Sequence, residues 1–179
     1  MSLLRGDRVV LRRLGAGDEE AFLEMVAVSR RLHHPWVSPP ADTDGFAGLL
    51  ERTASDDFVS LLGWDRGDGA LVGVVNLSQI SRGLFQSCYC GYYANAPRAR
   101  RGLMTETLSL GLRYAFTIER LHRVEANVQP GNATSLAIVQ RLGFRHEGFS
   151  PRYLKIGGRW RDHERFAMTV EDWRRSTRS

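Results

Sequence analysis

Arg98-Ala99-Arg100-Arg101-Gly102-Leu103-Met104 lies between two segments of different periodicity. The preceding residues, 85–95, are mostly aromatic or small, which is typical of a central β-strand. The following residues, 102–118, carry apolar side chains at helical spacing, namely Leu103, Leu108, Leu112 and Ala115. The pattern therefore predicts a strand, a short loop and a long helix that begins near Gly102.

A helix start of this kind can hold an anion. Its first backbone N–H groups have no partner within the helix, and the helix dipole places partial positive charge there. Gly102 would let that backbone approach a phosphate closely, and Arg98, Arg100 and Arg101 add positive charge. A pyrophosphate is therefore one expected ligand. Arginine-rich helix starts also bind nucleic acid or simply face solvent, so the loop alone leaves the ligand open.

A second helix start follows about 30 residues later. Residues 122–128 form a predicted strand, Pro130-Gly131 a turn, and residues 135–142 a helix. Asn132 and Ser135 stand at the start of this helix, where their side chains are suited to capping free N–H groups. Because they accompany the arginine loop, they are also candidates for ligand contact.

The rest of the chain predicts a sheet with short connections. Strands are expected at residues 8–14, 57–64, 70–80, 152–156 and 160–169, the last two joined by a Gly157-Gly158 turn. Further helices are expected after Asp18 and around residues 46–50. We expect a single α+β domain over residues 1–179, with a mixed, mostly antiparallel central sheet flanked by about four helices. Residues 170–179 are expected to be a short basic tail.

Composition narrows the class of protein. The 179 residues are 42% hydrophobic and 25% charged, as in a soluble globular domain, and the net charge of +5 is compatible with an anionic ligand. Cys88 and Cys90 are too few and too close for a disulfide framework or a zinc site, so we expect reduced thiols and no metal. The chain has no apolar run of membrane-spanning length and no signal-peptide pattern, which predicts a cytoplasmic protein.

Several motifs together resemble one enzyme family. They are Ser81-Arg82-Gly83, Cys88-Tyr89-Cys90-Gly91-Tyr92, Leu142-Gly143-Phe144 and Gly158-Arg159-Trp160-Arg161-Asp162-His163. With the arginine loop, Asn132 and Ser135, they are similar to the GNAT acetyltransferase superfamily of the RimJ/RimL type, which acetylates the N-termini of ribosomal proteins. The Ser-Arg-Gly turn and the Trp-Arg-Asp-His motif are most similar to the branch that acetylates the N-terminal alanine of a small-subunit ribosomal protein.

This resemblance implies acetyl-CoA as cofactor, held in a gap where the sheet splays between the strand ending at Asn95 and the strand ending at Val128. It implies that the cofactor contacts backbone groups on one strand, the arginine loop and the second helix start: Tyr93, Ala94, Asn95, Arg98, Arg100, Arg101, Gly102, Leu103, Met104 and Asn132. The family's loop usually has Gln or Arg where this chain has Ala99. We therefore expect re-routed side-chain contacts, with phosphate held mainly by backbone N–H groups.

Acetyl transfer to an amine needs a proton acceptor for the amine and a proton donor for the departing thiolate. The resemblance implies Ser135 as the general acid. Strand alternation places Glu125 near the gap as a candidate base, although a carboxylate between Arg123 and Asn127 also fits an ion pair. Ordered water is a further proton acceptor to consider, and His122 and His163 are also possible bases.

The acceptor groove is expected to contain aromatic side chains. The candidates are Trp36, Tyr92, Tyr153 and Trp160, with core packing as the alternative for each. The expected acceptor is a primary amine, foremost the N-terminal α-amine of a protein such as a ribosomal protein. A small-molecule amine, including an aminoglycoside, and a non-catalytic basic module that docks on ribosomal RNA are the alternatives. We expect a monomer or homodimer with no direct nucleic-acid role.

Overall fold

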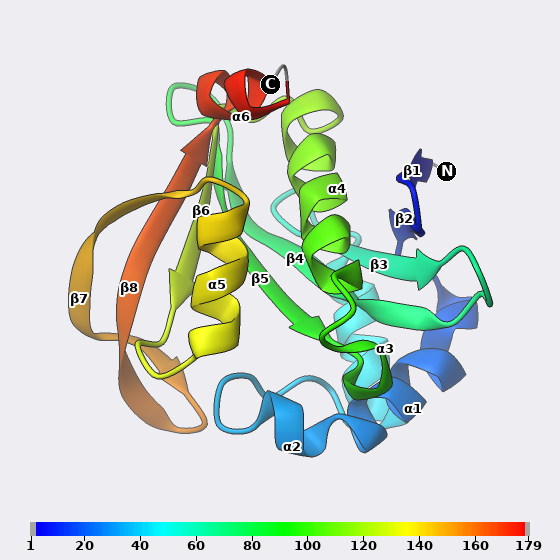
Figure 1. The fold of residues 1–179 in the computed structure, drawn as a ribbon. Helices are drawn as coiled ribbons and strands as arrows, with labels where there is room; N and C mark the ends of the chain where they lie inside the picture. The colour runs from blue at the N-terminus through cyan, green and yellow to red at the C-terminus, as the bar shows by residue number, and fades with distance from the viewer. Residues whose placement is uncertain (1–2, 178–179) are drawn as a thin grey trace.

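Eight strands form one sheet in the computed structural model, which describes residues 3–177 (Figure 1). Their order is β1-β2-β3-β4-β5-β6-β8-β7, and neighbouring strands run antiparallel except β5 and β6. Their bounds are β1 Leu3–Arg5, β2 Val9–Arg13, β3 Val59–Asp65, β4 Leu71–Ser81, β5 Ser87–Ala94, β6 Arg123–Val128, β7 Arg145–Ile156 and β8 Arg159–Thr169. The predicted mixed, mostly antiparallel sheet is confirmed.

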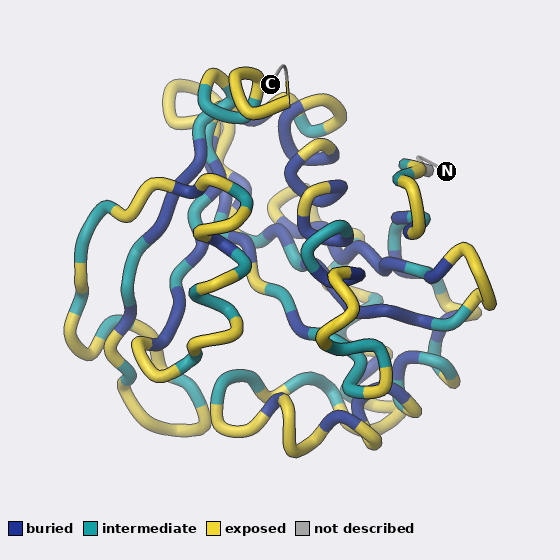
Figure 2. Tube along the Cα trace, in the orientation of Figure 1, coloured by how far each residue is buried: buried dark blue, intermediate teal, exposed yellow. Residues whose placement is uncertain are grey.

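Helices cover both faces of this sheet because successive strand residues point to opposite sides. On one face, α4 (Leu103–Thr117) and α5 (Ala133–Arg141) pack on residues such as Val75 and Val124. On the other face, α1 (Glu19–Val28) and α3 (Thr43–Arg52) pack Phe22 and Phe46 on Val74. Figure 2 shows the resulting buried central strands between exposed turns.

The sheet opens between β5 and β6. These two parallel strands pair only from Ser87↔Arg123 to Tyr89↔Glu125, whereas β5 continues to Ala94 and β6 to Val128. Beyond Tyr89, the two strands therefore leave backbone groups facing a gap rather than each other. The splay implied by the family resemblance is confirmed.

The described residues form two α-helices in addition to the four that the sequence predicts. Helix α2 (Arg30–His33) follows α1, and α6 (Val170–Ser176) occupies most of the expected basic tail. Thr169 caps α6 by accepting a hydrogen bond from the Asp172 backbone N–H, and the Trp173 ring lies 5.5 Å from that of Phe116. Residues 170–176 thus form a helix that the sequence did not predict, because the cap and the aromatic contact with Phe116 hold them in place. Residues 178–179 lie outside the described part.

Candidate active site

The arginine loop enters α4 as the sequence predicts. Gly102 adopts a left-handed φ of 77° at the N-cap, and the first helical hydrogen bond runs from Glu106 N to Gly102 O at 3.1 Å. The N–H groups of Leu103, Met104 and Thr105 consequently have no acceptor within the helix. The side chains of Leu103 and Met104 are buried in the core, so only their backbone groups are available to a ligand. This entrance fits the diphosphate of a nucleotide cofactor.

The three loop arginines divide into two roles. The Arg98 guanidinium lies 2.6 Å from Asp68 and 3.4 Å from Asp65, both in the region of the β3–β4 turn. Its side chain therefore anchors the loop to that turn instead of adding a free charge to a phosphate site, which departs from the sequence-based prediction. Arg100 and Arg101 are exposed beside the helix start. These two side chains can still approach an anion.

The backbone of β5 presents selected groups to the gap. Asn95 N donates to Val72 O at 2.8 Å, so Asn95 directs its amide toward β4. Because hydrogen-bonding direction alternates along a strand, Tyr93 also turns to β4, whereas Tyr92 and Ala94 turn to the gap. The predicted contacts from the Tyr93 and Asn95 backbone are therefore wrong, and Tyr92 takes their place. The register with β4 decides this, and the sequence alone does not give the register.

The Ala94 carbonyl oxygen, on the gap side of β5, already has a hydrogen-bond partner. It lies 2.8 Å from His33 Nε2, at the end of α2, and a carbonyl can only accept. His33 therefore donates from Nε2, and its buried position lowers its pKa. The Ala94 N–H and both backbone groups of Tyr92 remain for a ligand that lies along β5 as an added strand. These groups fit the amide-bearing arm of coenzyme A.

Tyr92 and Ser135 meet across the gap. Ser135 Oγ donates to the Tyr92 hydroxyl at 2.7 Å, and that hydroxyl donates to Ser135 O at 3.2 Å. Asn132 Oδ1 accepts from Ser135 N at 3.2 Å and caps α5, as expected from its residue type. Burial raises the pKa of Tyr92, which keeps its phenol protonated near neutral pH. The site thus contains two coupled, protonated hydroxyls at the start of α5.

Trp36 lies where the segment after α2 crosses the end of the gap. Its carbonyl oxygen accepts from Gln129 Nε2 at 3.1 Å, just after β6. Its indole ring packs against Gly131, where an added Cβ would come within 3.0 Å of Trp36 Cη2. Since His33 binds β5 and Trp36 binds the β6–α5 turn, this segment bridges the two halves of the split sheet. Figure 1 shows α2 beneath the gap.

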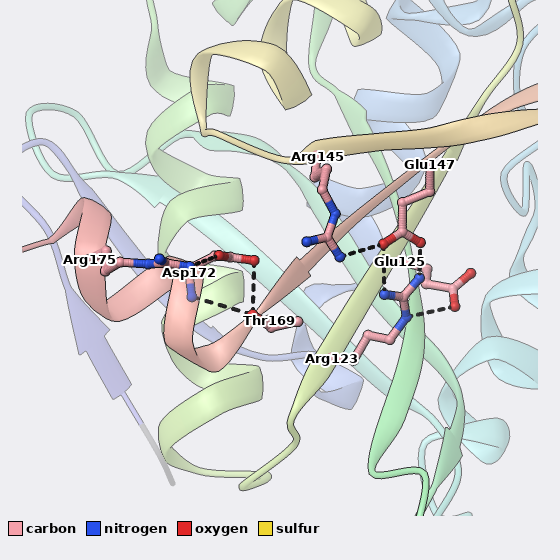
Figure 3. A network of polar contacts seen from close by, with 7 residues as sticks. All are labelled: Arg123, Glu125, Arg145, Glu147, Thr169, Asp172 and Arg175. Atoms are coloured by element: carbon pink, nitrogen blue, oxygen red, sulfur yellow. Dashed lines mark hydrogen bonds and ion pairs between the residues drawn. The ribbon is translucent and has the colours of Figure 1, made fainter.

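The candidate base Glu125 lies in an ion-pair network (Figure 3). Glu125 Oε1 accepts from Arg123 Nε at 3.0 Å, and Arg123 also binds both carboxylate oxygens of Glu147. Arg145 binds Glu147 at 2.8 Å. These arginines hold the pKa of Glu147 down to about 2. The ion-pair alternative weighed for Glu125 is therefore present, and its catalytic role stays a prediction.

His163 and Tyr153 lie on the β7–β8 side of the same face. His163 is 3% exposed, and its Nδ1 lies 3.0 Å from Arg161 O. Because that carbonyl can only accept, Nδ1 carries the proton and Nε2 carries the lone pair of the neutral ring. Burial lowers the pKa of His163, which favours this neutral form.

Tyr153, predicted to contact the acceptor, packs its ring 6.1 Å from that of His163. The Tyr153 and Tyr89 hydroxyls lie 3.3 Å apart, which brings β7 and β5 together across the floor of this face. That hydrogen bond, with burial, raises the pKa of Tyr89 to about 12. Tyr89 was not among the sequence candidates, because only the fold brings it next to Tyr153.

Two other expectations concern cysteines and metals. Cys88 and Cys90 are free and buried, and burial raises the pKa of both thiols. Among residues 3–177, no cluster of three His, Cys, Asp or Glu side chains could hold a metal ion. No helix of that part is long and apolar enough to cross a membrane.

Comparisons with known proteins agree with this geometry. The acetyltransferase (GNAT) domain family matches residues 8–145. The chain is 32% identical over 178 residues to the [ribosomal protein uS5]-alanine N-acetyltransferase of Escherichia coli strain K12, covering 95% of this chain and 92% of that protein. Mycobacterium smegmatis RimJ in complex with CoA-disulfide aligns with a TM-score of 0.83 and 28% identity, covering 91% of this chain and 82% of that one.

A third comparison confirms the fold. The ribosomal-protein-S5-alanine acetyltransferase from Vibrio fischeri aligns with a TM-score of 0.82 and 23% identity, covering 97% of this chain and 99% of that one. The predictions of family, enzyme class and cofactor are confirmed by these matches together with the split sheet and the open start of α4. The chain therefore belongs to the GNAT acetyltransferase family, is RimJ/RimL-like, and is an N-acetyltransferase that uses acetyl-CoA.

Proposed function

We propose that this enzyme acetylates the N-terminal α-amine of a protein, with a ribosomal protein as the substrate class and the cytoplasm as the compartment. The observation that carries the proposal is the 32% identity, over 95% of the chain, to an enzyme named for alanine N-acetylation of ribosomal protein uS5. The exposed positive charges of Arg100 and Arg101 are compatible with a protein substrate, because both side chains lie at the entrance for the cofactor.

Acetyl-CoA, when bound, supplies the acetyl group as a reactive thioester. Arg100, Arg101 and the unpaired N–H groups at the start of α4 would hold its phosphates, and the Tyr92 and Ala94 backbone would hold its arm. An N–H group on this edge of β5 also suits the developing negative charge of a carbonyl oxygen under attack. The arrangement orients the thioester at the mouth of the gap.

Ser135 is the proton donor in this proposal. Its hydroxyl lies at the start of α5, and its only described hydrogen-bond partner through Oγ is the Tyr92 hydroxyl at 2.7 Å. Tyr92 positions Ser135 and, being protonated, can resupply the proton that Ser135 gives up. Both residues were candidates from the sequence, but their coupling is a finding of the structure.

His163 is the proton acceptor that the geometry favours over Glu125. Glu125 already holds Arg123 at 3.0 Å, whereas the neutral His163 ring has its Nε2 lone pair free of any described hydrogen bond. One face of the sheet carries His163, Glu125 and Asn127. Helices α1 and α3 cover this face only over β3, β4 and β5. The acceptor amine can therefore approach the gap from this face.

The proposal is tested with a panel of acceptors. Peptides that begin with Ala, Ser or Met are compared with spermidine-like polyamines and an aminoglycoside, and thiol release from acetyl-CoA is measured. We expect the highest kcat/KM for a peptide that begins with Ala. A higher kcat/KM for a small-molecule amine would contradict the proposed substrate class. Tight RNA binding that falls steeply with salt, together with no thiol release from any acceptor, would instead support the basic-module alternative.

A further inference from the structure

Five residues form a polar row straight across the sheet, on the face opposite α4 and α5. Ser60 in β3 stands opposite Asn76 in β4, and Asn76 stands opposite Gly91 in β5. Beyond the split, Asn127 in β6 stands opposite Arg165 in β8. The β5–β6 register, Tyr89↔Glu125, places Gly91 and Asn127 at the same level on the two sides of the gap. We call these residues the polar row.

Four side chains of the polar row each have one buried polar atom without a partner. Ser60 Oγ, Asn76 Oδ1, Asn127 Oδ1 and Arg165 Nε are all buried, and none has a hydrogen-bond partner among the described residues. The buried Tyr93 hydroxyl, beside Asn76, is also without a partner in normal geometry. A buried polar group that lacks a hydrogen bond destabilises the folded protein, so such groups are rare in structural positions. Four of the nine unpartnered side-chain atoms found among the described residues lie in this one row, which is compatible with a ligand that supplies the missing partners.

The middle of the polar row is open. A Cβ added at Gly91 would meet no atom within 4 Å, and Gly91 is exposed although it lies in a central strand. Its neighbours on the same face, Tyr89 and Tyr93, are large. Gly91 therefore leaves a space between two aromatic residues, directly where the sheet begins to split.

We propose that the polar row receives the amino end of the acceptor, with the α-nitrogen above Gly91. This inference rests on the proposed function and assigns its substrate subsite. A neutral amine offers two N–H donors besides the lone pair that attacks the thioester, and Asn76 Oδ1 and Asn127 Oδ1 are acceptors on either side of the space. Arg165 Nε is a donor, which suits the first carbonyl oxygen of a peptide. The row thus offers hydrogen-bond acceptors to the α-amine and then a donor to the first carbonyl oxygen. These two groups follow each other in the same order in a peptide N-terminus.

The lack of charge in the acceptor part of the row has a chemical consequence. A carboxylate at Asn76 or Asn127 would favour the protonated ammonium, which cannot attack a thioester. Neutral amide oxygens bind the amine without that penalty. Ser135 and Tyr92 lie on the α5 side of the sheet, so an amine above Gly91 would approach from the face opposite the proton donor. Attack and leaving-group protonation would then proceed from opposite sides of the gap.

Gly91→Ala tests this assignment. The backbone at Gly91 is not in the left-handed region and the new methyl group meets no protein atom, so the melting temperature should stay unchanged. The KM for an Ala-starting peptide should rise about tenfold or more, the usual effect of one methyl group in a binding pocket, while the KM for acetyl-CoA stays the same. Gly48→Ala, also free of contacts within 4 Å but located in α3, is the matched control and should change neither KM.

Asn127→Leu is the second variant, and it keeps the number and branching of the side-chain heavy atoms while removing the acceptor oxygen. Calorimetry of the peptide in the presence of unacetylated coenzyme A should show weaker binding for Gly91→Ala and Asn127→Leu than for wild type and Gly48→Ala. Unchanged peptide KM and affinity in both variants would overturn the inference and assign the row to structural water. Wild-type enzyme that binds coenzyme A but releases no thiol with any peptide would overturn the proposed function itself.

Discussion

At the scale of single residues, the hydrogen bond between Ser135 and Tyr92 is the feature most directly tied to the chemistry. Ser135→Ala should lower kcat about 100-fold, the lower end of the usual contribution of general acid catalysis, with little change in the KM for acetyl-CoA. Tyr92→Phe should lower kcat less, because Ser135 keeps its own proton. Steady-state kinetics of both variants and the double variant test the coupling. If the two single effects simply add, the hydroxyls act independently and the relay is wrong.

His163 gives a pH-dependent prediction at the same scale. Tyr153 faces it from β7, and Asp162 on β8 opposes part of the burial effect on its pKa. The pKa of His163 is lowered, so the neutral, proton-accepting form should persist below pH 6.5 and be lost as pH falls further. The kcat/KM of wild type should therefore decline on an acidic limb that His163→Gln removes.

Glu125→Gln is the comparison for that prediction. Because Glu125 is paired with Arg123, we expect this variant to keep most of its activity and the same acidic limb. If Glu125→Gln loses activity and His163→Gln does not, the base is Glu125.

At the scale of elements, the start of α4 depends on the left-handed conformation of Gly102. Gly102→Ala should destabilise the protein by about 1 to 2 kcal/mol, the cost of that conformation for an L-residue, and should weaken coenzyme A binding by displacing the free N–H groups. Gly83→Ala is a matched control, since Gly83 has a φ of 76° and lies in a distant turn. Denaturant unfolding should show similar losses for both, and calorimetry should show weaker coenzyme A binding only for Gly102→Ala. Equal coenzyme A affinities would contradict the loop assignment.

The Arg123–Glu147 pair joins strands that are not neighbours, because β8 lies between β6 and β7. The pKa of Glu147 is about 2, below its ordinary 4.5, so its stabilising contribution is complete above about pH 4.5 and is lost as pH falls toward 2. Glu147→Gln should lower the free energy of unfolding at pH 7 by about 1 to 2 kcal/mol, reduced by solvent at this partly exposed site. The difference from wild type should disappear near pH 2. A difference independent of pH would argue against the ion pair as its cause.

At the scale of the whole molecule, the segment from His33 to Trp36 connects the two halves of the split sheet. Trp36→Ala removes the ring that covers Gly131 at the start of α5, so the acceptor side of the gap should lose part of its cover. The peptide KM should rise more than the acetyl-CoA KM. Leu32→Ala, at an exposed position of α2 just before this segment, is the control and should change neither KM. Equal rises in both KM values for Trp36→Ala would contradict an acceptor-side role.

Much of this fold follows from local pattern. The apolar side of α1, formed by Phe22, Met25 and Val26, is buried as its helical spacing predicts. Asn132 caps α5 as its residue type predicts, and Gly102 occupies the left-handed position at the entrance to α4. Family motifs added the enzyme class and cofactor. Helix α6 escaped prediction because its stability depends on Trp173 packing on Phe116, a contact between segments far apart in sequence.

The amino-acid sequence determined most of the strands and four of the helices, where the helix start suited to an anion lies and which enzyme family the chain belongs to, because helix periodicity, caps and turns depend on neighbouring residues. The tertiary structure alone decided that Arg98 is bound to Asp65 and Asp68, that Tyr92 rather than Tyr93 faces the gap, and that Ser60, Asn76, Gly91, Asn127 and Arg165 form one row. These properties depend on strand register and on contacts between distant segments. A one-residue change of register would reverse every side chain of a strand, and no local signal fixes it.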